Sequence, residues 1–258
     1  MTPKYCIKLK KKSAKEIASF LIKKFNENKV NHLVEEFKKF GFSSRSLIND
    51  LENLFKFLVL LSYDRRPFSP YEIVWDRENP NSVFSILEEN GLLNLSNILK
   101  TPEDELHKYL DKLRVKGLRL SYLDLGKRIK ASKTLKEIAS RVDKIMAQLR
   151  NLTSGYDVFV LHKMLDDIYG IGPTIASKFI LYVVRCMGVG GINPSEYGDL
   201  ALNLKDEWRI SKWVKRLKDA GILEEVKREL RQDPFAFDYF WDLDRNFCSK
   251  RRCEECEL

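Results

Sequence analysis

Apolar residues recur at steps of three and four along most of this 258-residue chain, and this spacing restricts the possible folds more than any other feature. Such a period places the apolar side chains on one face of an α-helix. No stretch of useful length alternates apolar and polar residues as a half-buried strand does. The sequence therefore predicts an all-α fold. Helices are expected over residues 14–25, 32–40, 46–61, 82–87, 103–113, 121–129, 135–149 and 158–168.

The charge of the chain points to the kind of partner. Its 46 Lys and Arg against 37 Asp and Glu give a formal net charge of +9. Such an excess favours an anionic partner, with nucleic acid foremost, although lysine-rich surfaces are also typical of thermophilic proteins. The scarcity of glutamine agrees with a thermophilic prokaryote.

No apolar run has the length of a signal-peptide core or of a membrane span. We therefore expect an intracellular protein of the cytoplasm or nucleoid that has no membrane partner and acts as a monomer.

Two glycines around one isoleucine form the sharpest motif, in the sequence IYGIGPTIASK at 168–178. Gly170 and Gly172 permit backbone angles that a β-carbon forbids, and Pro173 suits the first turn of a following helix. The first amides of that helix have no intrahelical partner, so a phosphate could approach them across the glycines. The motif predicts a hairpin of two helices that binds a nucleic-acid backbone, or else an ordinary helix end followed by a new helix. A second glycine-rich stretch, 188–199, is expected to be a flexible surface loop.

The cysteines gather near the C-terminus. Cys6 and Cys186 stand alone, whereas Cys248, Cys253 and Cys256 lie close together. Such spacing favours a metal site over a framework of disulfides.

The hairpin motif resembles the helix-hairpin-helix of the endonuclease III-like DNA glycosylases, in which Leu-Pro-Gly-Val-Gly is followed by two variable residues and Thr-Ala. Other segments are similar to motifs of that family and occur in the same order. They are LFKFLVLLSYDRRPF at 54–68, LRVKGLRLSYLDLGKRI at 113–129, EWRISKWVKRL at 207–217 and DRNFCSKRRCEEC at 244–256. The first fifty residues lie largely outside the resemblance.

The resemblance implies a two-lobed helix-hairpin-helix glycosylase-like fold with a DNA cleft between the lobes. A helical barrel lobe would span residues 51–187, and a C-terminal lobe would span 188–258. Residues 1–50 would be an N-terminal extension packed on the C-terminal lobe. The implied function is base-excision repair: the protein flips a damaged or mismatched base out of double-stranded DNA and hydrolyses its N-glycosidic bond.

Thr174 occupies the position at which bifunctional members of the family carry an imine-forming lysine. A hydroxyl cannot form an imine, so the resemblance implies a monofunctional enzyme that uses water. Lys178 lies one helical turn further along and is the alternative amine for a combined glycosylase and lyase. We expect Lys178 to be a solvated lysine near a phosphate. A protein that binds DNA without catalysis is a further alternative.

The family places its catalytic aspartate at the start of a helix, in a pattern of Asp, any residue, His or Arg, then Val or Ile, with a basic residue two positions further on. The segment EWRISK matches this pattern from Glu207, and Asp206 directly before it is the rival carboxylate. Either acid could instead simply stabilise the start of a helix.

The resemblance also implies residues that contact DNA. The expected DNA-binding residues are Gly170, Gly172, Thr174, Lys178, Arg65, Arg66, Arg119 and Arg209. Tyr63 and Tyr169 are the candidates for stacking on an exposed base, with core packing as the alternative.

Related enzymes hold a four-iron four-sulfur cluster with four cysteines, whereas only Cys248, Cys253 and Cys256 are close together in this chain. We therefore expect no intact cofactor. The alternatives at this position are a degenerate iron–sulfur site, a disulfide, a zinc site, or a cluster completed by Cys186 or Cys6.

Overall fold

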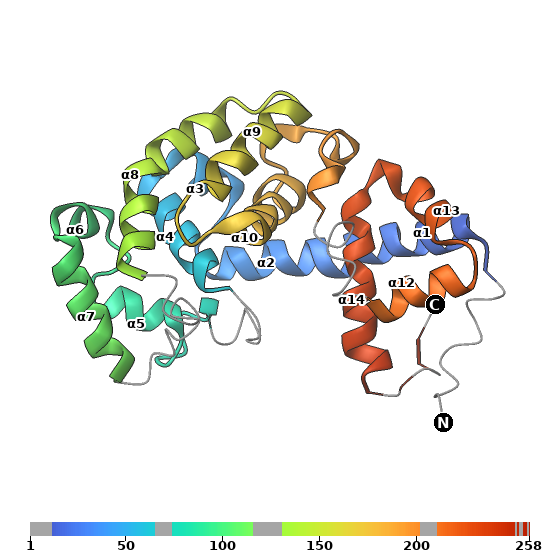
Figure 1. Cartoon of the computed structure of the whole chain (residues 1–258), viewed down its shortest axis with the longest axis horizontal. Coiled ribbons are helices and arrows are strands. Elements are labelled where there is room, and N and C mark those ends of the chain that lie inside the picture. Colours follow the sequence, from blue (N-terminus) through green and yellow to red (C-terminus); the bar gives the residue numbers. More distant parts are fainter. Residues whose placement is uncertain are drawn as a thin grey trace. The chain divides into compact units, whose positions relative to one another are not determined.

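The computed structural model describes residues 12–64, 74–115, 131–201 and 211–250, together with Arg252, Glu255, Cys256 and Leu258. Every regular element in these residues is a helix, which confirms the all-α prediction (Figure 1). No helix in these ranges has the length and apolar character needed to cross a membrane. The chain divides into two compact units, Val34–Gly191 and a second unit that joins Met1–Leu33 to Ile192–Leu258. The sequence predicts boundaries near residues 50 and 188.

The unit Val34–Gly191 holds the hairpin motif. Its elements are α2 (Asn31–Lys39, which begins just before the boundary), α3 (Ser44–Asn49), α4 (Leu51–Tyr63), α5 (Val83–Glu89), α6 (Leu95–Lys100), α7 (Glu103–Val115), α8 (Ala131–Arg150), α9 (Gly155–Asp166), α10 (Gly172–Phe179), the π-helix η6 (Ile180–Cys186) and the 3-10 turn η7 (Val189–Gly191).

The single helix expected over 46–61 is two helices, α3 and α4, and the reason is Asp50. Its backbone is extended (φ −122°, ψ 108°), which ends α3. Its carboxylate accepts the main-chain N–H groups of Glu52 at 2.9 Å and Asn53 at 3.1 Å, so Asp50 caps α4. Apolar periodicity continues through this break and therefore hides it.

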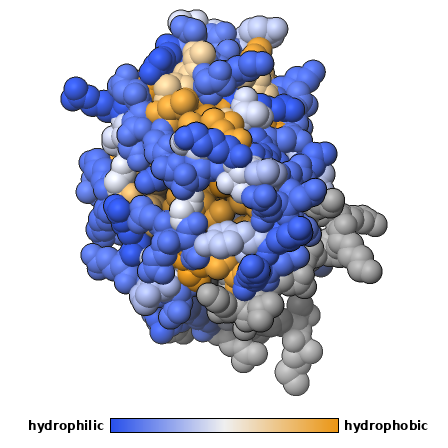
Figure 2. Space-filling view, turned by 90° about the vertical axis from the view of Figure 1, so that its left-hand side faces the viewer, coloured by the Kyte–Doolittle hydropathy of each residue, from blue (hydrophilic) through white to orange (hydrophobic). Residues whose placement is uncertain are grey.

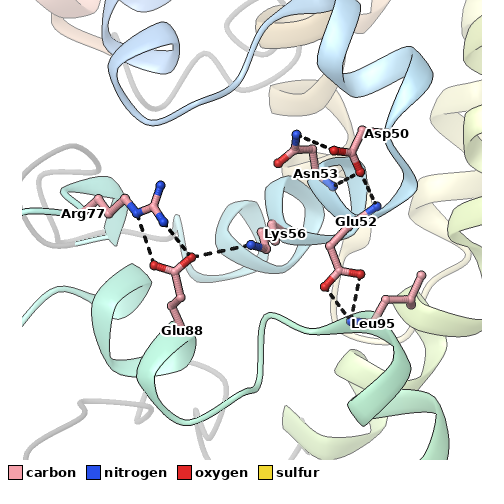
Figure 3. A network of polar contacts seen from close by, with 7 residues as sticks. All are labelled: Asp50, Glu52, Asn53, Lys56, Arg77, Glu88 and Leu95. Carbon is pink, nitrogen blue, oxygen red and sulfur yellow. Dashed lines mark hydrogen bonds and ion pairs between the residues drawn. The ribbon is translucent and has the colours of Figure 1, made fainter.

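A polar network joins α4 to α5 and α6 (Figure 3). The carboxylate of Glu52 accepts the main-chain N–H of Leu95 at 3.0 and 3.2 Å, at the first residue of α6. Glu88 on α5 pairs with Lys56 at 3.5 Å and with Arg77 at 3.2 Å. These contacts tie α5 and α6 to α4.

An aromatic cluster forms the core of this unit. The Trp75 ring lies 5.0 Å from Phe37 on α2 and 5.1 Å from Phe57 on α4, measured between centroids. Phe57 in turn contacts Phe179 of α10 at 5.9 Å, edge to face. The cluster therefore holds the second helix of the hairpin against α4 through fully buried rings.

The other unit is built around a smaller aromatic core. Its elements are α1 (Ala14–Lys24), the π-helix η2 (Phe25–Val30), the 3-10 turns η8 (Pro194–Glu196) and η9 (Gly198–Leu200), α12 (Ser211–Asp219), α13 (Leu223–Glu229), the 3-10 segments η11 (Leu230–Gln232) and η12 (Pro234–Asp238), α14 (Tyr239–Leu243) and the π-helix η13 (Asp244–Cys248). The Trp213 ring stacks on Phe240 at 4.8 Å, and α1 packs against α13.

Most residues of the glycine-rich stretch 188–199 are exposed or half-buried, as expected of a surface segment, and the stretch forms short helical turns. It consists of the short turns η7, η8 and the start of η9, and its Val189 and Tyr197 are buried. A β-carbon at Gly198 would lie 2.3 Å from Pro234, so glycine is required there for close packing and not for flexibility.

The face in Figure 2 is mainly hydrophilic, with hydrophobic residues visible between the polar ones. Large apolar side chains exposed among the described residues are Leu99 of α6, Tyr109 of α7 and Tyr156 of α9.

Candidate nucleic-acid interface

The predicted hairpin is present. Helix α9 ends at Asp166, the main-chain N–H of Ile168 donates to Leu165 and that of Ile171 to Ile168, and α10 begins at Gly172. Gly170 has φ +84° and Gly172 has φ +55°, both in the left-handed region. A residue with a β-carbon would be strained at either position by about 1–2 kcal/mol. Both glycines are thus required by the turn, as the sequence predicted.

The start of α10 is open. Its N-cap is Ile171, and no described side chain caps it, in contrast to the Ser, Asp or Asn caps of α1, α3, α4, α5, α6 and α9. A β-carbon built on Gly172 meets no atom within 4 Å. The uncapped amides and the empty space in front of Gly172 form a place where an anion can accept hydrogen bonds.

The turn is fastened to α8 by a bond that sequence reasoning did not foresee. The main-chain N–H of Tyr169 donates to the Glu137 carboxylate at 2.9 Å. The ammonium of Lys133 lies 4.4 Å from the centroid of the Tyr169 ring, and Arg141 pairs with Glu137 at 3.5 Å. The half-buried Tyr169 ring is therefore occupied on one face by a cation.

Lys178 is not the solvated lysine that we expected. Its side chain is only 14% exposed, and its ammonium donates to the main-chain oxygen of Asp64 at 2.6 Å and to Asp64 Oδ1 at 2.9 Å. Asp64 Oδ2 accepts the hydroxyl of Tyr182 at 3.1 Å. The partners are more than a hundred residues apart in the chain, so the pattern of α10 alone gives no sign of this cluster.

Tyr63 is a core residue in this structure, since the residue is only 5% exposed. Its hydroxyl has no hydrogen-bond partner among the described residues, and burial raises the pKa of the phenol well above its usual range. The ring lies at the buried end of the apolar helix α4 and offers no exposed platform for stacking on a base.

His162 adds a second tie within the hairpin. Its Nε2 lies 3.0 Å from Ser177 Oγ, which joins α9 to α10. The three histidines have no common spacing in the sequence, so only the fold reveals this contact.

Several predicted site residues lie outside the described residues. They are Arg65, Arg66, Arg119, Asp206, Glu207, Arg209 and Cys253. Thr174 is described, and it is half-buried in the first turn of α10.

Two of the three C-terminal cysteines, Cys248 and Cys256, are among the described residues. Cys248 and Cys256 are buried, and Arg216 Nη1 donates to Cys248 Sγ at 3.6 Å. Among the described residues no group of histidine, cysteine and carboxylate side chains is arranged to hold a metal ion, and no disulfide joins Cys186, Cys248 and Cys256 to one another.

Comparison with known proteins identifies no relative. No family model matches the chain, and no curated protein and no solved structure is significantly similar to it.

Proposed function

We propose that this protein is a DNA N-glycosylase that grips the backbone of double-stranded DNA with its α9–α10 hairpin. It removes a damaged or mismatched base by hydrolysis. The observation that carries the proposal is the start of α10. No described side chain caps it, the space beside Gly172 is open, and Gly170 and Gly172 both have positive φ. Backbone amides in such a turn read no sequence, which suits a protein that scans DNA for a rare lesion.

The basic composition supports a DNA partner. A net charge of +9 provides the long-range attraction that the amides of a single turn lack. The catalytic part rests on the resemblance, in which Glu207 or Asp206 would stabilise positive charge on the sugar as the glycosidic bond breaks.

The environment of Lys178 favours a monofunctional enzyme over a combined glycosylase and lyase. An amine must be free to attack the sugar carbon, whereas this ammonium is held by two oxygens of Asp64. Thr174 cannot take over that step.

The hairpin is tested with a pair of variants that differ only in charge, Gly172→Asp and Gly172→Asn. Both add a side chain at positive φ, where asparagine and aspartate are tolerated better than other residues. A carboxylate about 4 Å from a phosphate costs roughly 1 to 4 kcal/mol, so we expect the aspartate variant to bind duplexes of every sequence at least about fivefold more weakly than the asparagine variant. Binding is measured by fluorescence anisotropy.

Gly41→Asp is the matched control, because Gly41 also has positive φ (+84°) and open space around it but lies far along the chain from the hairpin. Its affinity should stay near that of the wild type. Equal affinity of the Gly172→Asp and Gly172→Asn variants, in folded protein, would remove the hairpin from the DNA interface.

A further inference from the structure

Apart from holding the Lys178 amine away from a nucleophilic role, the buried cluster of Asp64, Lys178 and Tyr182 has no part in the function proposed above. It lies where two elements meet: Asp64 follows the last residue of α4, Lys178 is in the hairpin's second helix, and Tyr182 is in η6, which continues that helix. The side chains of Asp64 and Lys178 are 3% and 14% exposed. An ion pair so deeply buried is costly unless both partners are kept in place.

The cluster also completes the end of α4. The last carbonyls of a helix lack intrahelical partners and carry partial negative charge. The Lys178 ammonium donates to the main-chain oxygen of Asp64 as well as to its carboxylate, so one cation satisfies the helix end and the side chain together. Close by, Phe57 and Phe179 join the same two helices through their rings.

We propose that the Asp64–Lys178 pair is a positioning lock that fixes the hairpin's second helix on α4 and thereby sets DNA affinity without touching DNA. This inference rests on the proposed function for its DNA readout. It makes Lys178 a positioning residue and not a phosphate contact.

The two roles of Lys178 predict opposite results for Asp64→Asn. If the lysine contacts phosphate, removing its carboxylate partner frees a cation and strengthens DNA binding. If the pair is a lock, Asp64→Asn and Lys178→Met both release α10 and both weaken binding. For such coupling we expect a loss within the usual range of about 5- to 150-fold.

The experiment measures the affinity of an undamaged duplex as a function of salt for the wild type, both single variants and the double variant Asp64→Asn/Lys178→Met. The lock predicts that both single variants bind more weakly than the wild type and that the double variant binds no more weakly than either of them. In all three variants the slope of log affinity against log salt concentration should equal that of the wild type. Lys163→Met is the charge control, because Lys163 is an exposed lysine on the neighbouring α9.

A tighter Asp64→Asn variant together with a Lys178→Met slope reduced by about one would overturn the lock in favour of a phosphate contact. Unchanged affinity in all three folded variants would overturn it as well. Where a single variant fails to fold, Lys178→Arg and Asp64→Glu keep the charges but change the reach, and the lock predicts weaker binding for both.

If the wild type binds no duplex, the proposed function fails and the lock is tested by hydrogen exchange. The α10 amides should then exchange faster in both single variants than in the wild type, with α13 unchanged. Equal exchange in α10 would contradict the lock.

Discussion

At the scale of single residues, a buried group of charges lies in the unit that contains α1. Lys29, near the end of the π-helix η2, hydrogen-bonds to Asp238 and lies 3.1 Å from Asp242 Oδ2. Burial lowers the pKa of Lys29, but the attraction of the two carboxylates outweighs it and raises the pKa above its ordinary range. The lysine therefore stays charged until strongly alkaline pH.

We predict that Lys29→Met destabilises the protein by roughly 3 to 5 kcal/mol, because it leaves two carboxylates buried without their cation. The free energy of unfolding in urea measures this. A loss below about 1 kcal/mol at neutral pH would show that water reaches the carboxylates.

Asp242, one of the two carboxylates beside Lys29, makes the stability of the protein depend on pH. Burial raises its pKa, with further contributions from Lys29, which lowers it, and Asp238, which raises it. The pKa of Asp242 is higher in the folded protein than in the unfolded chain, so the folded state binds the proton more tightly. The carboxyl group therefore adds to the free energy of unfolding at acid pH, and this contribution is lost as pH rises through the raised pKa. Asp242→Asn should therefore be at least as stable as the wild type at pH 7 and lose that advantage as pH falls toward 4. A variant that is less stable at pH 7 would contradict this.

Thr174 gives a chemical prediction at the same scale. Since a hydroxyl forms no imine and Lys178 is held by Asp64, borohydride should trap no covalent complex with abasic DNA. Gel electrophoresis after reduction measures this. A trapped adduct that disappears in Lys178→Ala would identify that lysine as the nucleophile.

At the scale of elements, the hairpin depends on α8 through one carboxylate. Glu137 accepts the N–H of Tyr169 and pairs with Arg141. Glu137→Ala would leave that part-buried N–H without its acceptor, at a cost of about 1 to 3 kcal/mol, and should loosen the turn. Glu137→Gln keeps an acceptor and serves as the control. If both variants bind DNA and resist urea as the wild type does, the contact does not support the turn.

The elements also show what sequence reasoning can and cannot find. Apolar periodicity predicted α1, α2, α8 and α9 closely, since each buries one stripe of a regular helix. It missed the break at Asp50, which depends on a cap. It also missed the bond of Glu52 to Leu95 (Figure 3) and that of Lys178 to Asp64. Such pairs are set by tertiary packing between residues far apart in the chain.

At the scale of the whole molecule, the glycine turn could be predicted from the sequence because a turn with two left-handed residues requires glycine. The exposure of individual side chains could not be predicted as well. The sequence around Tyr63 and Lys178 does not determine their exposure, and only the packed unit shows that both are buried.

The proposed chemistry depends on a carboxylate outside the described residues. We predict that Glu207→Gln abolishes base excision while DNA affinity stays near that of the wild type, and that Asp206→Asn has the smaller effect. Glutamine keeps the shape of glutamate but cannot stabilise positive charge on the sugar. Single-turnover excision and anisotropy are measured on the same preparations. The reverse order would assign the role to Asp206.

The most direct test of the account is an excision assay on duplexes that each carry one uracil, oxidised purine, oxidised pyrimidine, alkylated base or mismatched thymine. We predict that the protein releases at least one of these bases and that the strand breaks only after alkali is added. A wild-type protein that binds these duplexes with a steep salt dependence yet releases no base would contradict the glycosylase proposal and leave a DNA-binding protein.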